Sequence, residues 1–208
     1  MSPIFRLRLL PAVLFLTFGL SVLADGITSE KYPDADAVII DDVEDIEYRP
    51  DGTSVTKSEQ CVKVLTEKGR REESVITLFY SARYGSARIV DVKVTDAAGV
   101  TRDVDVSATT KDSTDNSSMS ANIYDPMDRK IVCTIPGVKV GETIRTRTER
   151  TTVKARIANQ WADISVLEWK LPILRATVRV RSPKDLPLKK NCFAQSAGER
   201  GRDRAGFA

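Results

Sequence analysis

The stretch Ile89-Val90-Asp91-Val92-Lys93-Val94-Thr95 decides the fold of this chain. Its valines alternate with Asp91, Lys93 and Thr95, which puts the valines on one face of a strand and the polar side chains on the other. One buried face and one solvated face are typical of antiparallel sheets. The stretch therefore predicts a strand that covers a core on one side only.

Similar alternation recurs from residue 36 to residue 182. It covers 37–48, 53–66, 73–80, 103–106, the threonine-rich 143–153, and 176–181. Turn residues separate these runs at Pro50-Asp51-Gly52, Lys68-Gly69, Ala98-Gly99, and Pro136-Gly137 with Gly141. No amphipathic helix of ten or more residues is indicated. Short strands spaced by turns predict an all-β, antiparallel, sandwich-like module.

Two regions break this pattern. Thr109 to Ala121 is polar and predicts a long exposed loop, which we take as the first surface on which to look for function, because loops carry function more often than strands. Asn191 to Ala208 has little apolar content, which predicts a disordered tail. The chain also stops soon after a well-patterned strand, which suggests an incomplete module.

Residues 1–24 predict a secretory signal peptide. Arg6 and Arg8 precede the apolar run from Leu9 to Leu20, and Ala24 provides a small residue before cleavage. That order of features is the secretory pattern, and the apolar run is short for a membrane anchor of roughly 20 residues. We expect an extracytoplasmic protein, periplasmic or secreted, with a β-rich module over 25–190.

Charge excludes one class of partner. The chain has 32 Lys and Arg against 29 Asp and Glu, a net charge of +3. The two signs are interspersed, so the clustered basic surface that nucleic acids require is missing. No later segment is apolar enough to span a membrane once the leader is removed. The expected partner is a protein or a cell-surface polymer.

Composition also argues against catalysis. The chain contains no histidine and three cysteines, which removes Ser-His-Asp and Cys-His arrangements and His-based zinc sites. No glycine-rich phosphate loop precedes a helix. The sequence predicts a protein that is not an enzyme, with no catalytic residue, no cofactor and no metal site. A glycosidase-like carboxylate pair stays conceivable, but nothing selects two residues for it.

Cys61, Cys133 and Cys192 allow no unique pairing, because the count is odd. Cys133 lies in Ile131-Val132-Cys133-Thr134-Ile135, on the same side as the two isoleucines. We interpret it as a small core residue rather than half of a disulfide bridge.

The acidic N-terminal portion and the two tryptophans each allow two interpretations. The acidic residues are Asp34, Asp36, Asp41, Asp42, Glu44, Asp45 and Glu47. They fit a solvated strand edge, where charge discourages pairing, better than a weak calcium site. Trp161 and Trp169 would share one face of a regular strand. Burial of both is favoured over an exposed platform that stacks on sugar rings.

Three features in order carry a family resemblance. They are Tyr32-Pro33-Asp34-Ala35-Asp36-Ala37-Val38-Ile39-Ile40 before the turn at Pro50, the strand through Cys61-Val62-Lys63-Val64-Leu65, and Pro136-Gly137-Val138-Lys139-Val140-Gly141-Glu142-Thr143-Ile144. Over about Tyr32 to Lys190 the chain resembles domain-of-unknown-function family 3857, an exported bacterial β-rich module usually found N-terminal to a transglutaminase-like domain.

The resemblance implies a non-catalytic accessory module of an envelope protein. It assigns the Cys-His-Asp chemistry to a downstream domain that this chain lacks, and it suggests that the β module itself is cut short. The alternative function is a carbohydrate-binding β-sandwich that uses Trp161 and Trp169.

Overall fold

The computed structural model describes residues 26–117, 119–121, 124–166, 170–184 and 188–189. The predicted signal peptide at 1–24, the predicted disordered tail at 191–208, Cys192 and Trp169 lie outside the described residues. In the part of the chain that is described, no helix has the length and apolar character needed to span a membrane.

The described strands form two sheets. The larger sheet has the order β5-β4-β8-β2-β1-β9 and the smaller has the order β3-β7-β6. All pairs are antiparallel except β1 with β9. The strands are β1 (Ala37–Tyr48), β2 (Ser54–Val64), β3 (Val75–Ser81), β4 (Gly85–Thr95), β5 (Thr101–Asp103), β6 (Thr110–Thr114), β7 (Asp128–Thr134), β8 (Thr143–Thr152) and β9 (Ala176–Arg181). The predicted all-β sandwich-like class is confirmed.

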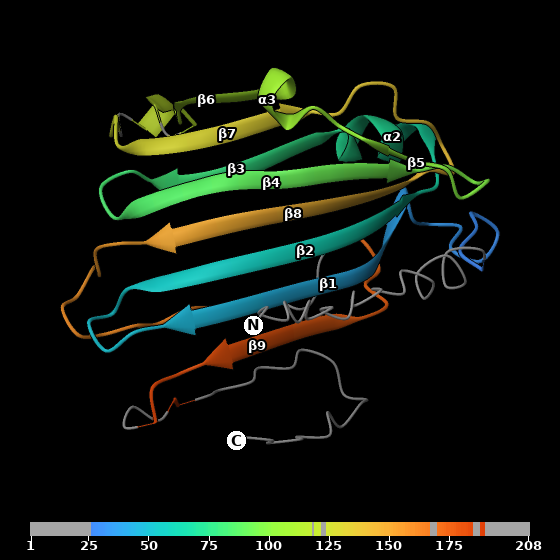
Figure 1. Ribbon diagram of the computed structural model, residues 1–208. Coiled ribbons are helices and arrows are strands. Elements are labelled where there is room, and N and C mark those ends of the chain that lie inside the picture. The colour runs from blue at the N-terminus through green and yellow to red at the C-terminus, as the bar shows by residue number, and fades with distance from the viewer. Residues whose placement is uncertain (1–25, 118, 122–123, 167–169, 185–187, 190–208) are drawn as a thin grey trace, which may run out of the picture.

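The smaller sheet lies at the β4 end of the larger one, as Figure 1 shows. Three short helical elements complete the described part: α2 (Glu67–Glu73), α3 (Val106–Thr109) and the 3-10 turn η1 (Met119–Ala121). The β1 and β2 part of the larger sheet extends well beyond the small sheet. This difference in width determines where the candidate site forms.

The main core lies between the two sheets. Val92 and Val94 of β4, Ile144 of β8, and Ile131 and Cys133 of β7 are all buried in it. Apolar side chains that alternate on each strand meet here, which is how a sandwich removes hydrophobic surface from water. The interpretation of Cys133 as a core residue is confirmed, since its side chain has no exposed surface.

Two smaller apolar clusters hold the ends of β1 and β2. On the outer face of the large sheet, Val38, Ile40 and Cys61 pack under Ile27 and Ala35 from the segment that precedes β1. On the inner face, the buried cluster is Ala37, Ile39 and Val62, against which Leu171 and Ile173 pack. The long connection from β8 to β9 therefore crosses the inner face of β1.

The position of Val90 differs from the prediction that all three valines of 89–95 share one face. It does not share a face with Val92 and Val94, because a bulge shifts the β4 register between Ile89 and Asp91. The extra residue in a bulge turns one side chain to the other face. Val90 is accordingly exposed, while Ile89 is buried in the core.

The predicted loop at Thr109 to Ala121 is wrong in its first half. Thr110–Thr114 forms β6, which pairs with β7 at the edge of the small sheet. The predicted strand at 103–106 is also misplaced, because β5 ends at Asp103 and α3 begins at Val106. The side chain of Asp105 caps that helix by accepting hydrogen bonds from the backbone N–H groups of Ser107 and Ala108, a standard cap.

The turn predicted at Lys68-Gly69 is the short helix α2. Thr66 caps it, with its hydroxyl oxygen accepting a hydrogen bond from the Gly69 N–H at 3.0 Å. A Cβ at Gly69 would overlap the carbonyl oxygen of Asp36, so glycine is required by close packing. The helix thus ties the segment before β1 to the start of β3.

Candidate functional site

A polar floor continues the inner face of the large sheet beyond the main core. On β2 the inward positions are Thr56, Ser58 and Gln60, and on β8 they are Thr146 and Thr148. The same face is apolar at Ile144 and at Val92. Side chains change from aliphatic to hydroxyl-bearing as the sheet passes out from under the small sheet.

This floor forms the base of a hollow of about 660 Å³. One wall is β3 together with Glu73 at the end of α2, and the other is formed by Asp42 and Glu44 on β1. Ser165, in the connection after β8, donates a hydrogen bond to Oε2 of Glu44 at 2.8 Å. The hollow therefore lies between the edge of the small sheet and the connection that crosses β1.

A second hollow of about 560 Å³ adjoins the first and is lined by aromatic residues. They are Phe79 and Tyr80 on β3, Tyr84 in the following turn, and Trp161. Thr56 and Arg150 line both hollows. We call these two adjoining hollows together the β3 groove. It has a carboxylate end near Glu73 and an aromatic end near Trp161.

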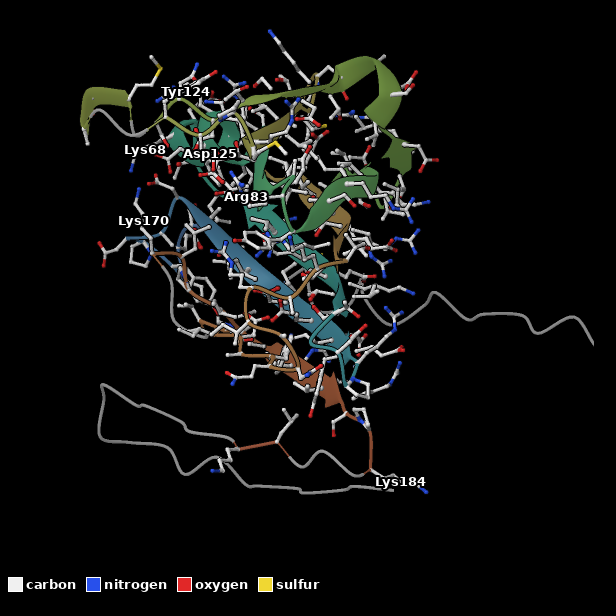
Figure 2. The ribbon with its side chains drawn as sticks, turned by 90° about the vertical axis from the view of Figure 1, so that its left-hand side faces the viewer. Lys68, Arg83, Tyr124, Asp125, Lys170 and Lys184 are labelled. Atoms are coloured by element: carbon white, nitrogen blue, oxygen red, sulfur yellow. The ribbon has the colours of Figure 1, made fainter. Side chains whose placement is uncertain are left out.

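The turn at the aromatic end is fixed by an ion pair. Arg83, between β3 and β4, donates from its guanidinium group to Asp125 Oδ2 at 3.0 Å, and Figure 2 labels both residues. Arg156 also lies over the ring of Tyr84, 4.7 Å from its centroid. These contacts hold the turn that closes the groove beyond β3.

The backbone of β3 offers hydrogen-bonding groups to the groove. Ser74 O accepts from Ile135 N at 2.8 Å and Ala82 N donates to Met127 O at 2.7 Å. Since hydrogen-bonded positions alternate along an antiparallel strand, the even-numbered residues of β3 pair with β7. Thr77 and the other odd-numbered residues then point their N–H and C=O groups away from β7. The Phe79 carbonyl indeed accepts from Arg150 of the other sheet at 3.3 Å.

Two carboxyl groups of the groove are held in an unfavourable environment. Burial raises the pKa of Asp42, and the hydrogen bond that Gln60 Nε2 donates at 3.4 Å only partly offsets this. Burial also raises the pKa of Glu73, helped by the neighbouring charge of Glu72. Raised carboxyl pKa values at a cleft are a known mark of functional sites.

Few cations balance these charges. Lys170 acts against the rise in the Glu73 pKa, but its Nζ is nearer to Glu72, 3.6 Å from Oε2. Figure 2 shows Lys170 on the same side of the molecule as Lys68, whose own partner is Asp36 at 2.5 Å. Arg150 lines both hollows of the groove, and Arg156 lines its aromatic end. The carboxylate end therefore carries excess negative charge.

The outer face of the large sheet has the opposite character, since its acids are paired with arginines. The pairs are Arg175 with Asp41 (2.6 Å), Arg179 with Asp45 (3.1 Å), Arg88 with Glu149 (3.1 Å), Arg145 with Glu59, and Arg147 with Asp91. Most of these side chains are partly exposed, so each pair contributes roughly 0–1 kcal/mol. The charges of these pairs balance one another on this largely solvated face.

The prediction that the acidic N-terminal strand forms a solvated edge is wrong. β1 is an internal strand with β2 on one side and β9 on the other. Its outward acids Asp41 and Asp45 pair with arginines just before and within β9, and its inward acids Asp42 and Glu44 line the groove. Among the described residues, no three or more His, Cys, Asp or Glu side chains form a group that could hold a metal ion.

Trp161 does not lie on the regular strand that would have placed it on one face with Trp169. Residues 153–166 contain no regular strand, so Trp161 is not part of an alternating face. Its ring stacks on Tyr48 with a centroid distance of 4.9 Å and an interplanar angle of 6°, which leaves it half-buried at the aromatic end. Trp169 lies outside the described residues.

Cys61 and Cys133 are buried free thiols.

The groove was difficult to predict from the sequence alone. Thr56, Ser58, Thr146 and Thr148 occupy inward positions where a core strand would have aliphatic residues. That departure from an apolar inner face was the available signal. It could be recognised only with the pairing of β2 and β8, in which Ser58 lies opposite Thr148, 90 residues further along the chain.

A solved structure with a similar fold is among the matches. It is from Parabacteroides distasonis and is described as a "putative protease", with a TM-score of 0.62, 14% sequence identity, and coverage of 73% of this chain and 30% of that chain. This chain thus spans less than a third of that protein. The CBM3a-L domain of a Clostridium thermocellum scaffoldin is far more distant, with a TM-score of 0.35, 11% identity, and coverage of 64% of this chain and 79% of that domain.

No curated protein matches the chain in sequence. The family of domains of unknown function DUF3857, for which a structure has been solved, matches residues 50–205. That range is most of the chain and includes every strand except β1. This agrees with the resemblance that the sequence indicated. The chain belongs to the DUF3857 family.

Proposed function

We propose that this chain is a non-catalytic, extracytoplasmic accessory module that binds an extended polymer in the β3 groove. The observation that carries the proposal is the groove itself, which continues along β3 from Glu73 to Tyr84. Its floor is hydroxyl-rich and one of its walls is a strand edge. A long polar channel of this kind suits a linear chain better than a compact small molecule, which a closed apolar pocket would favour.

A substitution that fills the groove tests this function. Ser58→Trp places a large ring on the half-buried floor, whereas Lys57→Trp places the same ring on the exposed outer face of the same strand. We expect the first variant to lose binding to a polymer found in a panel of denatured polypeptides and cell-wall polysaccharides. The second variant should bind as the wild type does. Equal binding by both variants, with wild-type folding, would exclude the groove.

The absence of catalysis is part of the proposal. Asp42 and Glu73 have raised pKa values, but no histidine exists in the chain to act with them as a base or to activate a nucleophile. We expect the purified protein to leave peptide, ester and glycoside substrates intact. If the wild type turns over a substrate and each single variant, Asp42→Asn and Glu73→Gln, loses that activity, the protein is an enzyme and this part of the proposal is wrong.

The predicted signal peptide and the family support a proposal about where the protein acts and which domain it accompanies. We propose export through residues 1–24 and action beside a transglutaminase-like domain of a longer protein. Fractionation of cells that express the full chain should place the processed form outside the cytoplasm. Sequencing of the downstream DNA in all three frames tests the context, since the proposal requires a continuation with Cys, His and Asp.

A carbohydrate ligand is the second candidate, favoured by the aromatic end of the groove. Phe79, Tyr84 and Trp161 line it, and Phe79 is 54% exposed. Exposed aromatic rings stack well on apolar sugar faces. Polysaccharide that changes tryptophan emission in the wild type but not in Trp161→Phe would support this candidate. An unchanged emission spectrum across the polysaccharide panel would count against it.

A further inference from the structure

We propose that the polymer is a basic polypeptide segment that binds in extended form as an added strand along β3. This inference rests on the proposed function and names the ligand class of the same groove. Among the described strands, β3 is an edge strand of the small sheet and pairs with β7. Addition of a strand to such an edge is an established mode of peptide recognition.

The edge of β3 lacks the features that normally prevent strand addition. It has the sequence Val75-Ile76-Thr77-Leu78-Phe79-Tyr80-Ser81, with no charged residue and no proline. Proteins usually protect exposed edges with charges, prolines or bulges. The other edge of the same sheet, β6, carries Lys111 and Asp112, and the edge strand β9 carries Arg179 and Arg181. Among these edges β3 is the one left competent to pair.

The unpaired backbone groups lie on the groove side. Val75 and Thr77 direct their N–H and C=O groups toward it, by the alternation that Phe79 and Arg150 demonstrate. A polypeptide supplies N–H and C=O groups at the matching spacing, whereas a polysaccharide does not. With a rise of about 3.3 Å per residue, the seven residues of β3 can pair with a segment about 23 Å long.

The acidic residues that line the groove favour a basic peptide segment. Asp42 and Glu44 project from β1 toward the groove, and Glu73 lies at its end. No arginine or lysine pairs with Asp42 or Glu44 among the described ion pairs, in contrast to the paired acids of the outer face. Lysine or arginine on the bound strand would supply the missing partners. A second copy of this chain would instead bring like charges together at a shared β3 edge.

A matched pair of proline variants tests the edge. Thr77→Pro removes an N–H that points into the groove and leaves the β7 ladder intact. Thr114→Pro does the same on the opposite edge, because Asp115 N donates to Asp128 O and so Thr114 points away from β7. Proline is tolerated at such edge positions. Both variants should keep the urea midpoint of the wild type.

The probe is a nine-residue peptide of alternating lysine and valine, with a glutamate-for-lysine version as its control. We expect the lysine peptide to bind wild type and Thr114→Pro equally, and Thr77→Pro at least tenfold more weakly. A triple variant, Asp42→Asn with Glu44→Gln and Glu73→Gln, should also lose at least tenfold in affinity. If Thr77→Pro does not fold, this triple variant decides the outcome.

Three results would overturn the inference. The first is that wild type and Thr77→Pro bind the peptide equally. The second is that the protein binds polysaccharide but not the peptide. The third is that the wild type sediments as a dimer and Thr77→Pro as a monomer. Binding of a polysaccharide that Ser58→Trp blocks and Thr77→Pro does not would leave the proposed function intact. If neither peptide nor polysaccharide binds in the groove, both the proposed function and this inference are wrong.

Discussion

Ile144 marks the boundary between the apolar core and the polar floor, and its truncation should be costly. Its side chain is 3% exposed and belongs to the main core cluster. The Ile144→Ala substitution removes three carbon atoms, which at about 0.8 kcal/mol each corresponds to about 2.4 kcal/mol of lost transfer free energy. The residual cavity increases the destabilisation to about 3 kcal/mol.

The matched control is Thr146→Ala, at the next inward position of β8. Thr146 is half-buried and lines the groove floor, so its truncation leaves no closed cavity. We expect it to lower the free energy of unfolding by less than about 1 kcal/mol. Because both positions lie on the same strand and have the same partner strands, a difference between the two variants reports the edge of the apolar core and not the strand pairing.

Urea denaturation measures both variants. With a dependence of about 2–3 kcal/mol per M of urea, Ile144→Ala should lower the unfolding midpoint by about 1 M or more. Thr146→Ala should lower it by a few tenths of that value. Similar losses at the two positions, or a loss below about 1 kcal/mol for Ile144→Ala, would refute the placement of the core boundary between them.

Three further predictions concern burial and close packing. Asp42→Asn should raise the free energy of unfolding at neutral pH, because a raised pKa means that the charged form destabilises the fold; the advantage should vanish below the ordinary value of 3.8, and a less stable variant at pH 7 would contradict the cause given. Gly85→Ala should cost about 1–3 kcal/mol in denaturation, because a Cβ would overlap the Thr151 carbonyl; a neutral effect would show that the two strands can separate there. Cys61, whose pKa burial raises to about 11, and Cys133 should resist iodoacetamide in the folded protein at pH 8 and react in urea; rapid labelling of the native form would contradict their burial.

The strands could be predicted where apolar side chains or residues that favour extended backbone mark them. The predicted stretch 37–48 matches β1 closely because the core buries its apolar residues. The predicted stretch 143–153 matches β8 because threonine favours strands, although most of its side chains are polar on both faces. β6 was missed since Thr110–Thr114 has no apolar residue to mark an inner face. Its strand state comes from pairing with β7, a tertiary effect that outweighs local composition.

The position of β1 within its sheet could not be predicted from its own residues. Acidic side chains on a strand usually indicate a solvated edge. Here Arg175, just before β9, and Arg179 on β9 pair with acids of β1 that lie more than 130 residues away, as the Asp45 and Arg179 pair illustrates. The β3 groove was hidden for the same reason, since Ser58, Thr148 and Thr77 come together only after the two sheets assemble.

The central claim is that the free edge of β3 receives a polypeptide strand, and amide hydrogen exchange measures this directly. NMR-detected exchange of the Val75, Thr77 and Phe79 amides should slow at least tenfold when the lysine-valine peptide is added. The Asp112 and Thr114 amides on the opposite edge should not change. A peptide that binds while the three β3 amides exchange at their free rates would contradict the account.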